Sequence, residues 1–283
     1  MREPAVAGQF YADDPAALAH QVEACFRSTR GPGALPEPHR RPERHVRAII
    51  VPHAGLDYSG PIAALAYAAV AAERPPASVL VLGVDHYAAG RGAALSAVDW
   101  RTPLGAVACA HPLLDRLRRP PLEVDEAAHA REHSIEVQLP FLDYVLPRPR
   151  FVALQIRFGP FAALDRVAAV VRAAVADEDV LLVASTDFSH YVPVEVARRQ
   201  DALAIEAILA SDGRRLYDTV EAHAISMCGV APTTVLLRAL AGEGLTPRLL
   251  RWGHSGEATP MPDVVGYAAL LLESSAPLPP PVK

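Results

Sequence analysis

The sequence predicts a single α/β domain with a central, mostly parallel or mixed sheet and helices on both faces of that sheet. Three apolar runs rich in β-branched residues have the length and composition of buried parallel strands: residues 46–51, 78–82 and 179–184. Segments with a helical pattern alternate with these runs along the chain. Such alternation is typical of a sheet whose parallel strands are joined by covering helices.

The remaining elements follow from weaker patterns. Three further strands are expected at residues 151–156, 247–252 and 264–272. Helices are expected at residues 15–26, 61–72, 134–145, 162–176, 194–209 and 232–240. The chain has 283 residues, 51% of them hydrophobic, and shows no internal repeat, which favours one large core. We therefore expect one domain over residues 1–275, followed by a proline-rich tail at residues 276–283.

Composition disfavours two classes of partner. The formal net charge of −5 argues against a nucleic-acid-binding surface. No stretch reaches the ~20 uninterrupted apolar residues that a membrane span requires, so no membrane partner is expected. The first residues, Met1 to Pro4, lack the apolar segment of a signal peptide. We expect a cytoplasmic protein.

The three cysteines are too few and too widely spaced for a disulfide framework or a closed zinc site. Cys25 falls in a predicted helix and Cys109 in an alanine-rich run, which favours simple burial for both. Cys228 comes just before a predicted helix, whose N-terminus would stabilise a thiolate. Cys228 is therefore a candidate nucleophile or metal ligand, with burial as a small apolar residue as the alternative.

Histidines follow three of the predicted strands. His53, His86 and His190 each come a few residues after the end of a buried strand. The carboxyl ends of parallel strands meet at one edge of a sheet, where ligands of α/β proteins bind. A single loop histidine is usually no more than a hydrogen-bonded residue, but the repeated placement favours a shared site.

Two further segments carry polar residues with suggestive spacing. His133 and Glu136 are three residues apart and would share a face of the predicted helix. Glu132 or His133 would cap that helix or orient a ligand, and a purely structural role explains them equally well. Asp187 and His190 are also three apart, a spacing that suits a carboxylate orienting an imidazole.

Several long motifs, in order along nearly the whole chain, resemble the Memo family, whose prokaryotic members are called AmmeMemoRadiSam system protein B. The motifs are Arg2 to Tyr11 (REPAVAGQFY), Val51 to Gly55 (VPHAG), Tyr58 to Gly60 (YSG), Trp100 to Gly105 (WRTPLG), Glu132 to Glu136 (EHSIE), Asp187 to Tyr191 (DFSHY) and Cys228-Gly229. Their number and order make the resemblance specific.

The resemblance implies a fold like that of class III extradiol dioxygenases, which use non-haem iron(II). Carried over by motif, His53, His86 and Cys228 would be the metal ligands. Asp187 and His190 would be the catalytic residues of the same pocket, with His190 in the place of the dioxygenases' acid–base histidine. The expected cofactor is a transition metal ion, with iron first and copper or zinc as alternatives.

The sequence departs from the dioxygenase pattern at two places. Cys228 stands where the dioxygenases have a carboxylate ligand, and a thiolate favours Cu(I), Zn or thiolate-bound iron. Val84 and Asp85 precede His86 where relatives more often show proline and asparagine. The first departure puts ring cleavage in doubt, while the second leaves the histidine in place.

Three functions remain open at this point. The first is a metal-dependent redox enzyme using iron or copper. The second is a non-catalytic accessory protein that binds a small molecule or peptide in the metal cleft. Its partners, as the system name implies, would be a radical S-adenosylmethionine enzyme and an AMMECR-type protein. The third is a zinc or thiol hydrolase with Cys228 as nucleophile and His190 as base.

Overall fold

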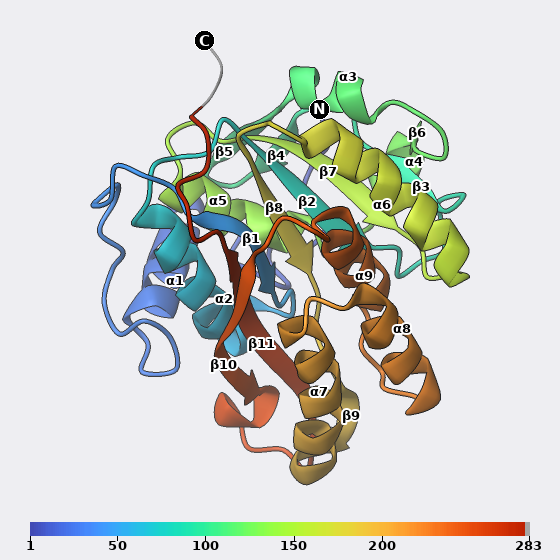
Figure 1. Ribbon diagram of the computed structural model, residues 1–283. Helices are drawn as coiled ribbons and strands as arrows, with labels where there is room; N and C mark the ends of the chain where they lie inside the picture. The colour runs from blue at the N-terminus through green and yellow to red at the C-terminus, as the bar shows by residue number, and fades with distance from the viewer. Residues whose placement is uncertain (281–283) are drawn as a thin grey trace.

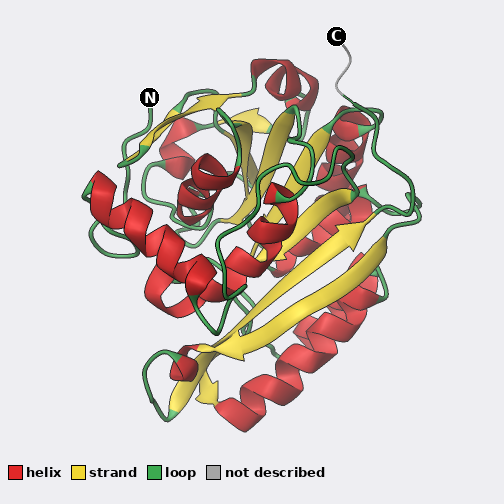
Figure 2. Cartoon of the chain, turned by 90° about the vertical axis from the view of Figure 1, so that its left-hand side faces the viewer, coloured by secondary structure: helices red, strands yellow, loops and turns green. Residues whose placement is uncertain are grey.

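The computed structural model describes residues 1–280 and shows a twisted mixed sheet between two layers of helices (Figures 1 and 2). The strands run in the order β10-β11-β1-β8-β2-β7-β3-β6, with β4, β5 and β9 attached at the side. Of the predicted proline-rich tail, residues 281–283 lie outside the described part. The tail before them lies against the domain, where the Leu278 amide donates to the Arg44 carbonyl.

The strands are β1 (Val46–Val51), β2 (Ser78–Val84), β3 (Ala93–Leu95), β4 (Trp100–Thr102), β5 (Gly105–Cys109), β6 (Glu123–Val124), β7 (Arg150–Ile156), β8 (Val180–Ser185), β9 (His190–Pro193), β10 (Thr246–His254) and β11 (Asp263–Glu273). The helices are α1 (Pro15–Arg27), α2 (Leu56–Ala71), α3 (His111–Leu117), α4 (Glu126–His129), α5 (Leu139–Val145), α6 (Phe161–Val175), α7 (Val194–Leu209), α8 (Gly213–Ala222) and α9 (Val230–Ala239), with short 3₁₀ turns at Glu136–Gln138 and Ser255–Glu257.

The centre of the sheet is parallel. Strands β1, β8, β2 and β7 pair in parallel, whereas β11 runs antiparallel to β1 and β10 antiparallel to β11. Every residue of β1 and β8 is buried, as expected of strands covered on both faces. The predicted α/β class and mixed sheet are therefore confirmed.

Alternate residues of the central strands supply two separate hydrophobic clusters. Ala48 and Ile50 of β1 face the cluster formed with α3, α6, α7, α8 and α9. Ile49 and Val51 face the cluster formed with α1, α2 and α5. Figure 1 shows these helices on opposite sides of the sheet, which places both cores between sheet and helices. Among the described residues, no helix combines the length and the apolar character needed to cross a membrane.

Helix α2 begins five residues earlier than the sequence predicts and contains Pro61 in its interior. Proline lacks the amide hydrogen that would bond to the Asp57 carbonyl, so a local pattern favours a helix beginning at the proline. The Arg30 guanidinium supplies the missing donor, with Nη2 2.9 Å from the Asp57 carbonyl oxygen. This contact spans 27 residues of sequence and could not be read from the local pattern.

Other elements also differ from the prediction. The helix expected at residues 134–145 is a 3₁₀ turn followed by the shorter α5, and α8 was not predicted. His190, expected in a loop, is the first residue of β9 and pairs with Val265 of β11. Strand β9 forms because β11 supplies a pairing partner that is distant in sequence. Helix α8 has a local signal that was missed, an Asp212 N-cap followed by an amphipathic segment.

Candidate metal centre

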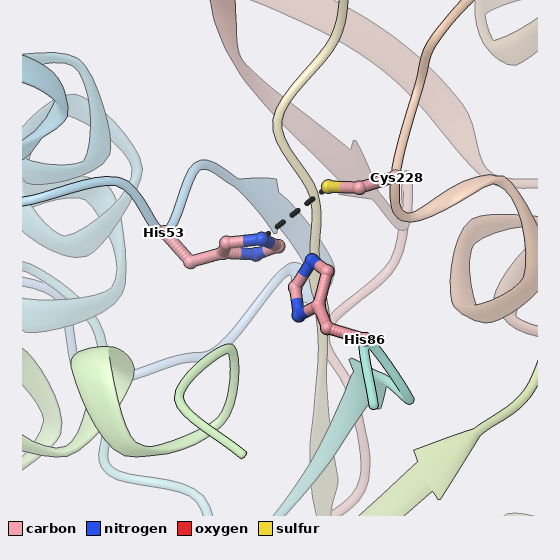
Figure 3. A group of neighbouring side chains, drawn as sticks. All are labelled: His53, His86 and Cys228. Carbon is pink, nitrogen blue, oxygen red and sulfur yellow. Dashed lines mark hydrogen bonds between the residues drawn. The ribbon is translucent and has the colours of Figure 1, made fainter. Parts of the chain in front are cut away.

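Three side chains meet at the carboxyl edge of the parallel strands. His53 follows β1, His86 follows β2, and Cys228 lies in the turn before α9. One ligand atom from each of the three residues lies within 4.8 Å of the other two. In Figure 3 the imidazole rings and the thiol point into the space between them. The structure thus brings together the ligand set that the sequence resemblance implies.

The environment of His53 determines which ring nitrogen carries the proton. Its Nδ1 lies 2.9 Å from the Ser185 hydroxyl oxygen. That hydroxyl donates its only hydrogen to the Ser134 carbonyl at 2.6 Å, so it can only accept from His53. Nδ1 therefore carries a hydrogen, and Nε2 presents a lone pair. Burial, with repulsion from His133 and His86, holds the pKa of His53 well below its ordinary value, which keeps the ring neutral.

A second layer of buried groups fixes this arrangement. The Gln138 amide nitrogen donates to the Ser185 hydroxyl and to the Pro52 carbonyl, both at 2.9 Å. The Tyr67 hydroxyl donates to the Gln138 carbonyl oxygen at 2.9 Å. Burial raises the pKa of Tyr67 well above its ordinary value, so this hydroxyl remains a donor. Each donor in the series from Tyr67 through Gln138 to Ser185 therefore has its own acceptor. The Ser185 oxygen is left to accept the Nδ1 hydrogen of His53.

The environment of His86 gives the same tautomer through a charged partner. Its Nδ1 lies 2.9 Å from one carboxylate oxygen of Glu132, and its backbone amide donates to the other oxygen at 2.9 Å. Burial alone would raise the pKa of Glu132, but the hydrogen bonds from His86 and Ser134 lower it to about 2. The carboxylate is ionised and can only accept. His86 therefore presents Nε2 to the centre, the pattern of a metal-bound histidine held by a carboxylate.

Cys228 completes the group. Its sulfur lies 3.3 Å from His53 Nε2 and 3.3 Å from the Asp187 amide nitrogen. The following Gly229 packs so closely on Thr186 that a Cβ there would overlap the threonine side chain. Any larger residue would push Cys228 away from the strand ends, which explains the Cys-Gly pair.

The expectation that a helix N-terminus stabilises the Cys228 thiolate is not supported. Burial, reinforced by the nearby Asp187, raises the pKa of Cys228 well above its ordinary value. Without a cation the thiol stays protonated, because burial and the nearby carboxylate disfavour the charged thiolate. This disfavours a free thiolate nucleophile, and with it the hydrolase hypothesis.

Asp187 and His190 lie beside this group, in separate surroundings. The Asp187 carboxylate accepts from the His53 amide at 2.8 Å, and burial raises its pKa to about 6. His190 donates from Nδ1 to the Ser226 carbonyl at 2.8 Å, which leaves the lone pair of Nε2 available. The predicted pairing of Asp187 with His190 is not formed, because each side chain bonds to backbone groups instead. His190 is outside the group of ligand atoms within 4.8 Å.

The segment at residues 132–136 has divided roles. His133 stacks on His86 with ring centroids 4.6 Å apart. Glu136 faces the other way and anchors the N-terminal segment, accepting from Arg2 at 2.7 Å and from the Tyr11 hydroxyl at 2.6 Å. Of the alternatives left open for Glu132 and His133, the structure supports ligand orientation for Glu132. The predicted shared helix face of His133 and Glu136 is wrong, because the helical turn begins only at Glu136.

The three donors fit a transition metal ion. Both imidazoles have Nδ1 engaged by another side chain, and both present Nε2 to the space that the Cys228 sulfur borders. Imidazole and thiol donors suit iron, copper and zinc and do not suit magnesium or calcium. The sequence analysis did not identify Ser185, Gln138 and Tyr67 as supports of the site. Of the three, only Ser185 carried a signal in the sequence, its position at the end of a buried strand.

Comparison with known proteins places the chain in one family. The family profile described as Memo-like protein matches residues 2–271. A MEMO1 family protein of Methanopyrus kandleri is 40% identical over 280 residues, covering 95% of this chain and 98% of that protein. One from Saccharolobus solfataricus is 38% identical over 281 residues, with the same coverage of both chains.

A solved structure shares the fold. The crystal structure of an uncharacterized protein from Escherichia coli K12 matches with a TM-score of 0.55 and 17% sequence identity, covering 80% of this chain and 99% of that one. At this identity the match shows the common fold alone. The near full-length matches to curated relatives and to the family profile show that the chain belongs to the Memo family.

Proposed function

We propose that this Memo family protein binds a single transition metal ion through His53, His86 and Cys228 and uses it in a redox reaction. The observation that carries the proposal is the shared tautomer of the two histidines, each with its Nδ1 hydrogen engaged and Nε2 directed inward. Two different supports enforce it, a neutral hydroxyl for His53 and a carboxylate for His86, and a merely structural pair of histidines would not need both. When bound, the metal would supply a redox-active Lewis acid beside the substrate.

The metal we propose is iron, with copper and zinc as alternatives. Two imidazoles and a thiolate are soft enough for Cu(I) and zinc and also suit thiolate-bound iron. Zinc would give no redox chemistry, so the metal bound after anaerobic purification decides between a redox protein and a hydrolytic or structural one.

We assign proton handling to Asp187 and His190. The Nδ1 of His190 is held by the Ser226 carbonyl, so Nε2 is the ring nitrogen that would exchange a proton with a substrate. The Asp187 carboxylate accepts from the His53 amide, and burial raises its pKa to about 6. A pKa this close to 7 allows the carboxyl group to take up and release a proton at neutral pH. The partners we propose are a small-molecule or peptide ligand in the cleft, a radical S-adenosylmethionine enzyme and an AMMECR-type protein.

Metal analysis after anaerobic purification tests the centre. We expect about one equivalent of iron or copper, its loss in His53→Ala and Cys228→Ser, and retention in Cys109→Ser, a buried cysteine away from the site. A thiolate-to-metal charge-transfer band that disappears in Cys228→Ser would identify the sulfur ligand. Equal metal content in Cys228→Ser and Cys109→Ser would rule the centre out.

The second candidate is a non-catalytic accessory protein. The observation in its favour is the 3.3 Å contact between the Cys228 thiol and His53 Nε2, which satisfies both groups without a metal. Oxidation of a small substrate that is lost in His190→Ala would favour the redox enzyme. Stable metal binding with no turnover of any substrate by the loaded protein would favour the accessory role.

A further inference from the structure

An open pocket of about 350 Å³ adjoins the metal centre and has Cys228 in its wall. Its other walls include Phe158 from the loop before α6, Val220 from α8, Ile225 and Met227 from the turn before α9, and Val230. Cys228 is therefore shared by the candidate metal centre and the pocket, and its sulfur faces His53.

The apolar walls are already in place. Val220, Ile225, Met227 and Val230 are buried members of the hydrophobic cluster on this face of the sheet. Phe158 is half-exposed and is held by stacking on Tyr217, with ring centroids 5.6 Å apart and planes 17° from parallel. The Tyr217 hydroxyl in turn donates to the Gly159 carbonyl at 3.2 Å, which ties the loop to α8.

Apart from Glu221 and the Cys228 thiol, the side chains that line the pocket are apolar. The charged group among the lining residues is Glu221, exposed at the end of α8. Water next to these apolar side chains is displaced by an apolar group with a gain in free energy. An anionic ligand would instead face the Glu221 carboxylate without a compensating cation.

We propose that this pocket receives an uncharged, apolar group of the substrate while a polar end of the same molecule reaches the metal. The proposal rests on the proposed metal centre and adds the chemical class of its substrate. An enclosed apolar cavity of about 150 Å³ holds a benzene molecule, so this open pocket has room for one ring with a short substituent. Cys228 links the metal centre to the apolar pocket because it borders both.

The pocket can be tested without metal through its methionine. The chain has three methionines, so selective methyl labelling gives few signals, and Met227 reports on the pocket while Met261 serves as an internal control. Titration of metal-free protein with benzyl alcohol is expected to shift the Met227 methyl and leave Met261 unchanged. Benzoate, of similar size but charged, is expected to bind at least tenfold more weakly. Equal binding of the two, or an unmoved Met227 signal, overturns the pocket assignment.

The link to the metal is tested with zinc-loaded protein and two chelating probes. Benzohydroxamate is expected to bind at least tenfold more tightly than acetohydroxamate, because its ring enters the pocket. Phe158→Asp, which places a charge in the wall, should reduce this ratio below about threefold. The matched control is Tyr58→Asp, another exposed aromatic residue, at the start of α2 and outside this pocket, which should keep the full ratio.

The two tests separate the possible failures. If the protein binds no metal but benzyl alcohol still shifts Met227, the proposed function fails and the apolar pocket stands. If metal binds and both hydroxamates bind equally well, the pocket is not the substrate's subsite and this inference fails while the metal centre stands.

Discussion

The two histidines at the strand ends are held in the same tautomer by opposite means. His53 is buried and donates to a neutral chain of hydroxyl and amide groups that starts at Ser185. His86 lies on the open side of the centre and donates to the ionised carboxylate of Glu132. A buried charge beside His53 would need its own compensation, whereas Glu132 is compensated by four hydrogen-bond donors.

The two supporting groups are equally buried, and they differ in charge. A neutral network orients a ring without adding charge, and a carboxylate orients it while also raising the basicity of the opposite nitrogen. We therefore expect the His86 support to contribute more to metal affinity and the His53 support to contribute mainly geometry.

The largest expected effect is that of Glu132→Gln on metal affinity. Both carboxylate oxygens accept hydrogen bonds, so the amide NH₂ of glutamine must face a donor. We expect a 10–100-fold loss of affinity, about 1.4–2.8 kcal/mol, measured by competition with a chelator. Glu136→Gln, also fully buried in the same segment, should lower stability but leave the affinity of the folded protein unchanged. Similar affinities of the two variants would contradict the support assigned to Glu132.

Gly83→Ala tests the packing behind the His86 support. A Cβ at Gly83 in β2 would overlap the side chain of the buried Ile135, in the segment that carries Glu132. We expect the free energy of unfolding to fall by about 2 kcal/mol in urea titrations. Gly159→Ala is the control, because its Cβ would meet open space. Equal stability of the two variants would show that the segment moves freely.

Ser185→Ala tests the neutral support of His53. It removes the acceptor of the Nδ1 hydrogen and leaves the donor of Gln138 unsatisfied. We expect about a tenfold loss of metal affinity, about 1.4 kcal/mol, which is at or below the loss in Glu132→Gln. Ser59→Ala, another buried serine with a single backbone partner, should not change affinity. A larger loss of affinity in Ser185→Ala than in Glu132→Gln would show that the His53 support contributes more to metal affinity than the His86 support.

Tyr67→Phe should have the smallest effect. It removes one hydrogen bond to Gln138, whose amide nitrogen remains fixed by Ser185 and Pro52. Stability is expected to fall by about 1 kcal/mol in thermal unfolding, with metal affinity within about twofold of wild type. A tenfold change in affinity would mean that the hydroxyl, and not the backbone carbonyl, fixes the amide.

Much of the fold could be predicted because it rests on local patterns. The apolar strands, most of the long helices and the order of the motifs are properties of short segments, and helix α7 was predicted with its observed bounds. The exceptions depend on distant partners. Helix α2 continues across Pro61 because Arg30 reaches its carbonyls, and β9 exists because β11 pairs with it.

The features of the site also fall into those that local sequence predicts and those that distant partners set. The sequence by itself determined that histidines follow the parallel strands, and its motifs pointed to His53, His86 and Cys228. Only the tertiary structure decided which nitrogen of each ring faces inward and that the Cys228 thiol is protonated when no cation is bound. A tautomer is set by the partner of the other nitrogen, and for His53 that partner, Ser185, lies 132 residues away. A thiol pKa is set by desolvation, which exists only once the chain has closed around it.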